Sequence, residues 1–203
     1  MAKRSVVVFD LGGVLIDWNP RYLYRKLFNG DVAAMEMFLT EICSPDWNER
    51  QDAGRRFQEA EDELIRQHPD KAKLIRAWCA RFDEMITGAI DGTVAVLEEL
   101  KSRGTPLYAL SNWSAETFPP QRDRFPFLGH FAGILVSGNE GMIKPDPRIF
   151  RLLLDRYGLR AEDSVFIDDN PGNARAAGDL GIHGIHFTSP AALRAELGAL
   201  GLL

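Results

Sequence analysis

The sequence is poor in cysteine and has no long apolar run. Its only cysteines are Cys43 and Cys79, and neither belongs to a close Cys or His cluster with metal-ligand spacing. We predict that both are reduced core thiols rather than a disulfide or metal ligands. The apolar run that begins at Ser5 is interrupted at Asp10, too early for a secretory signal, and no stretch reaches the ~20 apolar residues of a membrane helix. A cytoplasmic location is the resulting expectation.

The sequence also lacks a surplus of basic residues. Lys and Arg number 24 against 29 Asp and Glu, which gives a formal net charge of -5. Nucleic acid and anionic membranes attract basic surfaces, so neither is expected as a partner and a small molecule is favoured. A chain of 203 residues with 45% hydrophobic and 26% charged residues is typical of a globular protein, as a monomer or a homodimer, which excludes the disordered and fibrous classes.

What the sequence does contain is a series of short apolar runs separated by helical patterns. The run from Ser5 to Phe9 is β-branched and aromatic, which is typical of a strand buried on both faces. The alternation predicts an α/β fold, a Rossmann-like parallel sheet with helices on both faces and with its chemistry at the edge where the strands end. Similar strand patterns span 106–110, 133–136, 164–167 and 184–187, and helical patterns span 92–103, 147–157 and 171–180.

Residues 18–88 break this alternation, because they contain helical patches and no convincing strand. A helical stretch inserted directly after the first strand predicts a small cap over the edge where Asp10 emerges. We therefore expect a catalytic core of residues 1–17 and 89–203 and a helical cap of residues 18–88. The alternative is that these helices only cover one face of the sheet. The helical patches lie at 21–28, 32–42, 55–67 and 71–85.

Polar residues follow two of the predicted strands in a pattern that suits phosphate chemistry. Asp10 closes the first strand, and the glycines after it allow successive N–H groups to point at an anion. Its carboxylate can attack a bound phosphoryl group or merely cap the turn. Ser111 and Asn112 end another strand and offer a hydroxyl and an amide to phosphate oxygens, although both are also common turn formers.

A lysine and two adjacent acids follow later strands. Pro145 and Pro147 stiffen the loop that carries Lys144, whose ammonium can neutralise phosphate charge and pair with a carboxylate. Asp168 and Asp169 repel each other unless a cation lies between them and another acid, and helix capping explains only one of the two. Together with Asp10 they predict an all-oxygen site, which suits Mg²⁺ better than zinc or copper.

The sequence resembles the haloacid dehalogenase-like (HAD) hydrolase superfamily. The four motifs of that superfamily are matched, in the same order along the chain, by FDLGGVL, LSN, KPDP and FIDDN. The resemblance is closest to the small sugar-phosphate phosphatases whose first motif is DLGNV or DLGGV. It implies that Asp10 is a nucleophile that forms an aspartyl-phosphate, and that Lys144 bridges Asp10 and the phosphoryl group. The implied phosphate ligands are Leu11, Gly12, Ser111, Asn112 and Lys144, and the implied Mg²⁺ ligands are Asp10, Gly12 through its carbonyl, Asp168 and Asp169.

The first motif departs from the superfamily at Gly12. Most of its phosphatases carry a second Asp there, as general acid and base, and such catalysis is worth roughly 10²–10⁴-fold. Either the leaving group needs little protonation, as an anomeric oxygen does, or another group substitutes. Asp17 is the nearest acid, and we expect it to be structural.

The resemblance implies Mg²⁺-dependent hydrolysis of a small phosphorylated metabolite, most closely a sugar phosphate. A 2-haloacid dehalogenase, which also lacks the second Asp, is the alternative, but the fourth motif of those enzymes is typically Ser-Ser-Asn. A non-catalytic metabolite-binding module is a further alternative, which the retention of every metal and phosphate position disfavours. Residues expected to meet the substrate, unless they are core residues, are Trp18, Trp47, Arg50 and Trp113.

Overall fold

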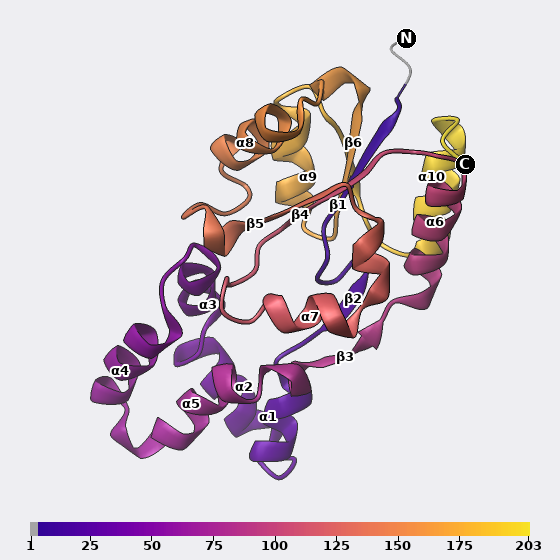
Figure 1. Cartoon of the computed structure of the whole chain (residues 1–203). Helices are drawn as coiled ribbons and strands as arrows, with labels where there is room; N and C mark the ends of the chain where they lie inside the picture. Colours follow the sequence, from indigo (N-terminus) through magenta and orange to yellow (C-terminus); the bar gives the residue numbers. More distant parts are fainter. Residues whose placement is uncertain (1–3) are drawn as a thin grey trace.

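The computed structural model describes residues 4–203, and its centre is a five-stranded parallel sheet of order β5-β4-β1-β6-β7 (Figure 1). The central strand, β1, pairs with β4 on one side and with β6 on the other. The predicted Rossmann-like α/β fold is confirmed. The strands are β1 (Val6–Phe9), β4 (Leu107–Ser111), β5 (Gly133–Val136), β6 (Ser164–Asp168) and β7 (His183–His186).

Helices cover both faces of this sheet because successive side chains of a strand point to opposite faces. Val7 and Phe9 of β1 join the core formed with α6 and α10, whereas Val8 joins the core formed with α8 and α9. Figure 1 shows the two helix pairs on opposite sides of the strands. These helices are α6 (Asp91–Ser102), α8 (Pro147–Tyr157), α9 (Pro171–Gly178) and α10 (Pro190–Ala199), with α7 (Pro119–Arg124) between β4 and β5.

A helical insert, residues 19–85, separates β1 from α6 in the chain and lies beyond the sheet rather than on its faces (Figure 1). Its interior is aromatic: the ring of Trp78 lies 5.4 Å from that of Trp47 and 5.9 Å from that of Tyr24. Because these rings pack on one another, the helices enclose apolar surface of their own. The helices are α1 (Arg21–Leu27), α2 (Val32–Glu41), α3 (Pro45–Asp52), α4 (Phe57–Gln67) and α5 (Ala72–Ala80).

Two short antiparallel strands, β2 (Ile16–Trp18) and β3 (Ile86–Ala89), connect the insert to the sheet. The prediction that 18–88 contains no strand is therefore wrong at both ends. Thr87 and Gly88 give β3 no apolar alternation, so the pairing depends on a partner distant in sequence. Short 3₁₀ helices complete the fold at Pro69–Lys71, Phe82–Met85, Pro126–His130, Ser137–Asn139 and Ala161–Asp163.

Cys43 and Cys79 are free, as predicted, with Cys43 buried and Cys79 half-buried. Among the described residues, every helix is too short or too polar to cross a bilayer.

Candidate active site

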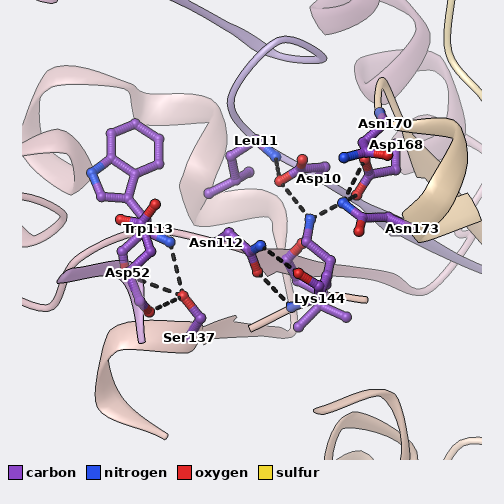
Figure 2. A network of polar contacts seen from close by, with 11 residues as sticks. Asp10, Leu11, Asp52, Asn112, Trp113, Ser137, Lys144, Asp168, Asn170 and Asn173 are labelled. Carbon is purple, nitrogen blue, oxygen red and sulfur yellow. Dashed lines mark hydrogen bonds and ion pairs between the residues drawn. The ribbon is translucent and has the colours of Figure 1, made fainter. Parts of the chain in front are cut away.

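Three charged side chains meet at the carboxyl ends of the central strands, as Figure 2 shows. The Nζ atom of Lys144 lies 3.0 Å from Oδ1 of Asp10 and 2.7 Å from Oδ2 of Asp168. Asp10 follows β1 and Asp168 ends β6, the strand paired with β1, so the parallel register brings them together. The side chains of Lys144 and Asp168 are completely buried. The lysine is thus held between two carboxylates, one of which, Asp10, faces the larger cavity described below.

The carboxylate of Asp168 is occupied by protein donors. Its Oδ1 accepts the N–H of Asn170 at 2.8 Å, and Nδ2 of Asn173 donates to Oδ1 at 3.0 Å and to Oδ2 at 3.1 Å. With Lys144 also donating to Oδ2, both oxygens are engaged. A buried carboxylate with this many donors is fixed in place, and we attribute to Asp168 the positioning of the Lys144 ammonium.

Asn112 fixes the main chain of Lys144 from the other side. The Nδ2 group of Asn112 donates to the carbonyl of Lys144 at 2.9 Å, and its Oδ1 accepts the N–H of Lys144 at 2.8 Å. Both polar atoms of the side-chain amide are therefore used within the protein. A phosphate contact from Asn112, as the motif implies, has to come from its main chain or from the second N–H of its Nδ2 group.

Burial and mutual repulsion govern the protonation of these groups. Burial raises the pKa of Asp10 to about 7, with Asp168 adding to the rise and Lys144 opposing it. Burial alone lowers the pKa of Lys144, but the charges of Asp10 and Asp168 outweigh it, so the net shift is upward. Burial and the neighbouring Asp168 also raise the pKa of Asp169. The cluster has more negative than positive charge, which favours a bound cation.

The geometry fits a small, hard cation. Asp10, Asp168 and Asp169 each offer a carboxylate oxygen, and these three atoms lie within 4.8 Å of one another. An all-oxygen donor set of this kind suits Mg²⁺. Gly13 is necessary for it, because a Cβ on this residue, whose φ is +74°, would lie 2.4 Å from Oδ2 of Asp169. Asp169 is exposed while Asp168 is buried and fully bonded, so Asp169 is the acid of this pair that is accessible to a metal.

Two adjoining cavities lie at this end of the sheet, and Asp10 lines one of them. The larger contains about 740 Å³ of space, part of it open to solvent, and lies against Asp10, Ser111 and Asp169. It also has Gly12 and Gly13 in its floor and Asn19, Pro20 and Arg21 in its rim. This cavity brings together the predicted nucleophile, a predicted phosphate ligand and a predicted metal ligand.

The smaller cavity, with about 340 Å³ of space partly open to solvent, has an aromatic wall. Trp18 stacks on Phe82 with ring centroids 6.4 Å apart, and Phe82 lies 5.9 Å from Trp113. Asn48 and Asp52 of α3 form the opposite, polar part of its lining. Gly12, Trp18 and Asn112 line both cavities, so one molecule can occupy both.

The remaining predicted substrate residues lie elsewhere. Trp47 is buried among Phe57 and Trp78 in the insert, and Arg50 is on the exposed face of α3, so neither lines the two cavities. Leu11 is buried, and its N–H donates to Oδ1 of Asp10 at 2.7 Å.

Sequence reasoning missed Asp52, Phe82 and Asn173, whereas Asn48 belongs to the stretch with Trp47 and Arg50 that was expected to meet the substrate. One available signal was the four-residue spacing of Asn48 and Asp52, which places both on one face of a helix. Asp17, which was expected to be structural, lies in β2, where it accepts hydrogen bonds from Tyr22 and Thr87.

A family model described as haloacid dehalogenase-like hydrolase matches residues 5–181. The chain belongs to this family of hydrolases. The membership predicted from the four motifs is confirmed. The HAD-like hydrolase described here is 30% identical over 196 residues to sesquiterpene phosphatase astK of Aspergillus oryzae, a match that covers 95% of this chain and 94% of the relative.

Solved structures share the fold of this HAD-like hydrolase. A HAD-like family hydrolase of Porphyromonas gingivalis is 24% identical, with a TM-score of 0.72 and coverage of 96% of this chain and 98% of that one. A HAD family enzyme of Bacteroides thetaiotaomicron, solved in complex with magnesium and inorganic phosphate, is 23% identical, with a TM-score of 0.72 and coverage of 91% and 94%.

Proposed function

We propose that this hydrolase is a Mg²⁺-dependent phosphoric monoester hydrolase that uses Asp10 as its nucleophile. The observation that carries the proposal is the arrangement around Asp10. The Leu11 N–H and the Lys144 ammonium both bind Oδ1, which leaves Oδ2 for attack on phosphorus. A carboxylate at the floor of a cavity, beside a buried cation and a cluster of acids, suits phosphoryl transfer through an aspartyl-phosphate.

The other residues of the site bind either the phosphoryl group or the metal ion. Lys144 through its charge, the hydroxyl of Ser111 and the main chain of Gly12 and Asn112 bind the phosphoryl group, whereas the N–H of Leu11 is used by Oδ1 of Asp10. Asp10, Asp169 and the carbonyl of Gly12 hold Mg²⁺, with Asp168 completing the acidic cluster. When bound, the metal supplies positive charge that offsets the repulsion between the attacking carboxylate and the phosphate. A fold neighbour binds magnesium and inorganic phosphate, which is consistent with these roles.

For the organic part of the substrate, two classes fit the smaller cavity. A sugar ring, as expected from the first motif, can place an apolar face on Trp18 and hydroxyl groups toward Asn48 and Asp52. A phosphate ester of an apolar alcohol is favoured by the three aromatic side chains and by the relative that is named a sesquiterpene phosphatase. Both are monoesters of a small alcohol, and the chemistry at Asp10 is the same.

The test measures phosphate release from p-nitrophenyl phosphate, sugar phosphates and prenyl monophosphates, with and without chelator. We expect activity that requires Mg²⁺ and is lost in Asp10→Asn, while the exposed Asp123→Asn control keeps it. Activity that survives in Asp10→Asn or in excess chelator would contradict the mechanism. Halide release from 2-chloropropionate without phosphate release would instead identify a dehalogenase.

A further inference from the structure

Gly12 leaves the reaction without the acid that most related phosphatases carry at this position. An added Cβ at Gly12 would meet no heavy atom within 4 Å among residues 4–203. The space in front of Gly12 is part of both cavities. A proton donor that approaches the leaving group from the insert therefore has room to do so.

Asp52 reaches this space from the insert. It is the last residue of α3 and lines the smaller cavity together with Gly12 and Asn112. The Nδ2 group of Asn48 donates to its Oδ2 at 2.9 Å, and the N–H of Ser114 also donates to its carboxyl group. Both donors hold the carboxyl group in place beside the loop that carries Ser111 and Asn112.

The main chain of Asp52 is anchored as well. Ser137 Oγ donates to the carbonyl of Asp52 at 2.6 Å and accepts the N–H of Trp113 at 2.9 Å. Figure 2 shows Asp52 and Trp113 converging on this hydroxyl. The end of α3 is thereby fixed to the sheet domain, so the position of the Asp52 carboxyl in the cavity is set by contacts on both of its sides.

We propose that Asp52 is the general acid and base of the reaction, in place of the carboxyl group that is absent at Gly12. The proposal rests on the phosphatase function proposed above. In the first step Oδ2 of Asp10 bonds to phosphorus, the bond from phosphorus to the ester oxygen breaks, and Asp52 gives its proton to that oxygen to release the alcohol. In the second step the Asp52 carboxylate takes a proton from water as the water oxygen bonds to phosphorus. The bond to Asp10 breaks, and phosphate leaves.

The protonation behaviour of Asp52 suits both steps. Burial raises its pKa to about 7, and the nearby Glu49 adds to the rise. The hydrogen bonds from Ser114 and Asn48 and the charge of Lys144 oppose it. A carboxyl group that titrates near neutral pH can give up and recover a proton in each cycle. Asp17, the nearest acid to Asp10 in the sequence, lies in β2 and is bound by the hydroxyls of Tyr22 and Thr87.

Asp52→Asn separates this role from a structural one, because the amide retains hydrogen-bonding capacity but cannot transfer the proton. With a primary alkyl phosphate we expect kcat to fall roughly 10²–10⁴-fold, since the alkoxide leaves poorly without a proton. With p-nitrophenyl phosphate we expect a burst of one nitrophenolate per enzyme followed by slow turnover, because the first step needs no proton whereas water attack still needs the base. The exposed acid of the same helix, Asp46→Asn, is the control and should match the wild type.

Rescue provides the second measurement. Adding Gly12→Asp to Asp52→Asn should restore alkyl phosphate turnover at least tenfold and abolish the burst, because the space at Gly12 accepts a side chain. Normal turnover by Asp52→Asn overturns the proposal. So does an equal loss with both substrates, without a burst and without rescue, which indicates a structural role. Loss of dependence on Asp10 would instead refute the phosphatase function itself.

Discussion

Asn112 and Lys144 are joined by two reciprocal hydrogen bonds, from the side-chain amide of one to the main-chain N–H and C=O of the other. The loop of Lys144 and the end of β4 therefore move as a unit. The buried ammonium depends on this pairing as much as on the two carboxylates that it contacts.

Asn112→Ala should consequently lower both stability and turnover. It removes the partners of two main-chain groups of Lys144, and each unpaired buried group costs about 1–3 kcal/mol. Thermal unfolding and steady-state kinetics measure the two effects, with the exposed Asn139→Ala as the control. An unchanged melting temperature would show that water replaces these bonds without cost.

Gly13→Ala should weaken Mg²⁺ binding. The added Cβ would lie 2.4 Å from Oδ2 of Asp169 and must displace that carboxylate, and the φ of +74° costs an L-residue about 1–2 kcal/mol. Calorimetric titration with MgCl₂ should show at least a tenfold loss of affinity. Gly198→Ala, a helix glycine with open space around it, should bind as the wild type does. Equal affinity of Gly13→Ala would exclude Asp169 from the metal site.

Lys144→Met should be strongly destabilising. It leaves the buried carboxylates of Asp10 and Asp168 without their shared cation, and breaking a buried pair in this way costs about 3–5 kcal/mol. Urea unfolding of the metal-free protein measures the loss. The further change Asp168→Asn should recover part of it, because one of the two unpaired charges is then gone. If Lys144→Met unfolds at the wild-type midpoint, the ammonium does not hold these acids together.

The pH dependence of stability should report on Asp52. Its pKa is about 7 in the folded chain against the ordinary value of 3.8, so the unfolded chain loses the proton first as pH rises. Stability due to this group is fully present below pH 3.8 and is lost as pH rises through about 7. The free energy of unfolding of Asp52→Asn, measured relative to that of the wild type, should therefore rise as pH increases from 3.8 to about 7. Above about pH 7 the difference between the two proteins should stay constant. Denaturant midpoints from pH 4.5 to 8.5 measure it, and parallel curves would refute the shift.

The sheet could be predicted because its central strands β1, β4 and β6 are largely apolar, and the polar residues at the ends of these strands suit no core. Helix α3 could not be predicted from the sequence, because Pro45–Asp52 has little apolar pattern. The helix depends instead on the Ser44 cap and on the packing of Trp47. The strand pair β2–β3 could not be predicted for a related reason. Its two strands are distant in sequence, and each supplies the hydrogen-bond partners of the other.

The charged residues beside the sheet could be predicted from the sequence, but the distances and hydrogen bonds between them could not. Asp10 and Asp168 follow strands whose parallel pairing brings them together, whereas Lys144 comes from a loop that the side chain of Asn112 holds beside them. The positions of Asp52 and Phe82 depend on how the insert packs against the sheet domain, which is a long-range contact that no local pattern encodes. The same contact explains why Trp47 faces the aromatic interior while Asn48, the next residue, lines the cavity.

The hydroxyl of Ser137 joins Asp52 to the loop after β4, and this bond sets an order of events. If the insert swings away, Asp52, Asn48 and Phe82 leave together, whereas Asp10 and Lys144 stay on the sheet. An open molecule then keeps its nucleophile but has no base to activate water. If Asp52 is the base, a phosphorylated Asp10 would therefore persist in any molecule whose insert has left the sheet domain.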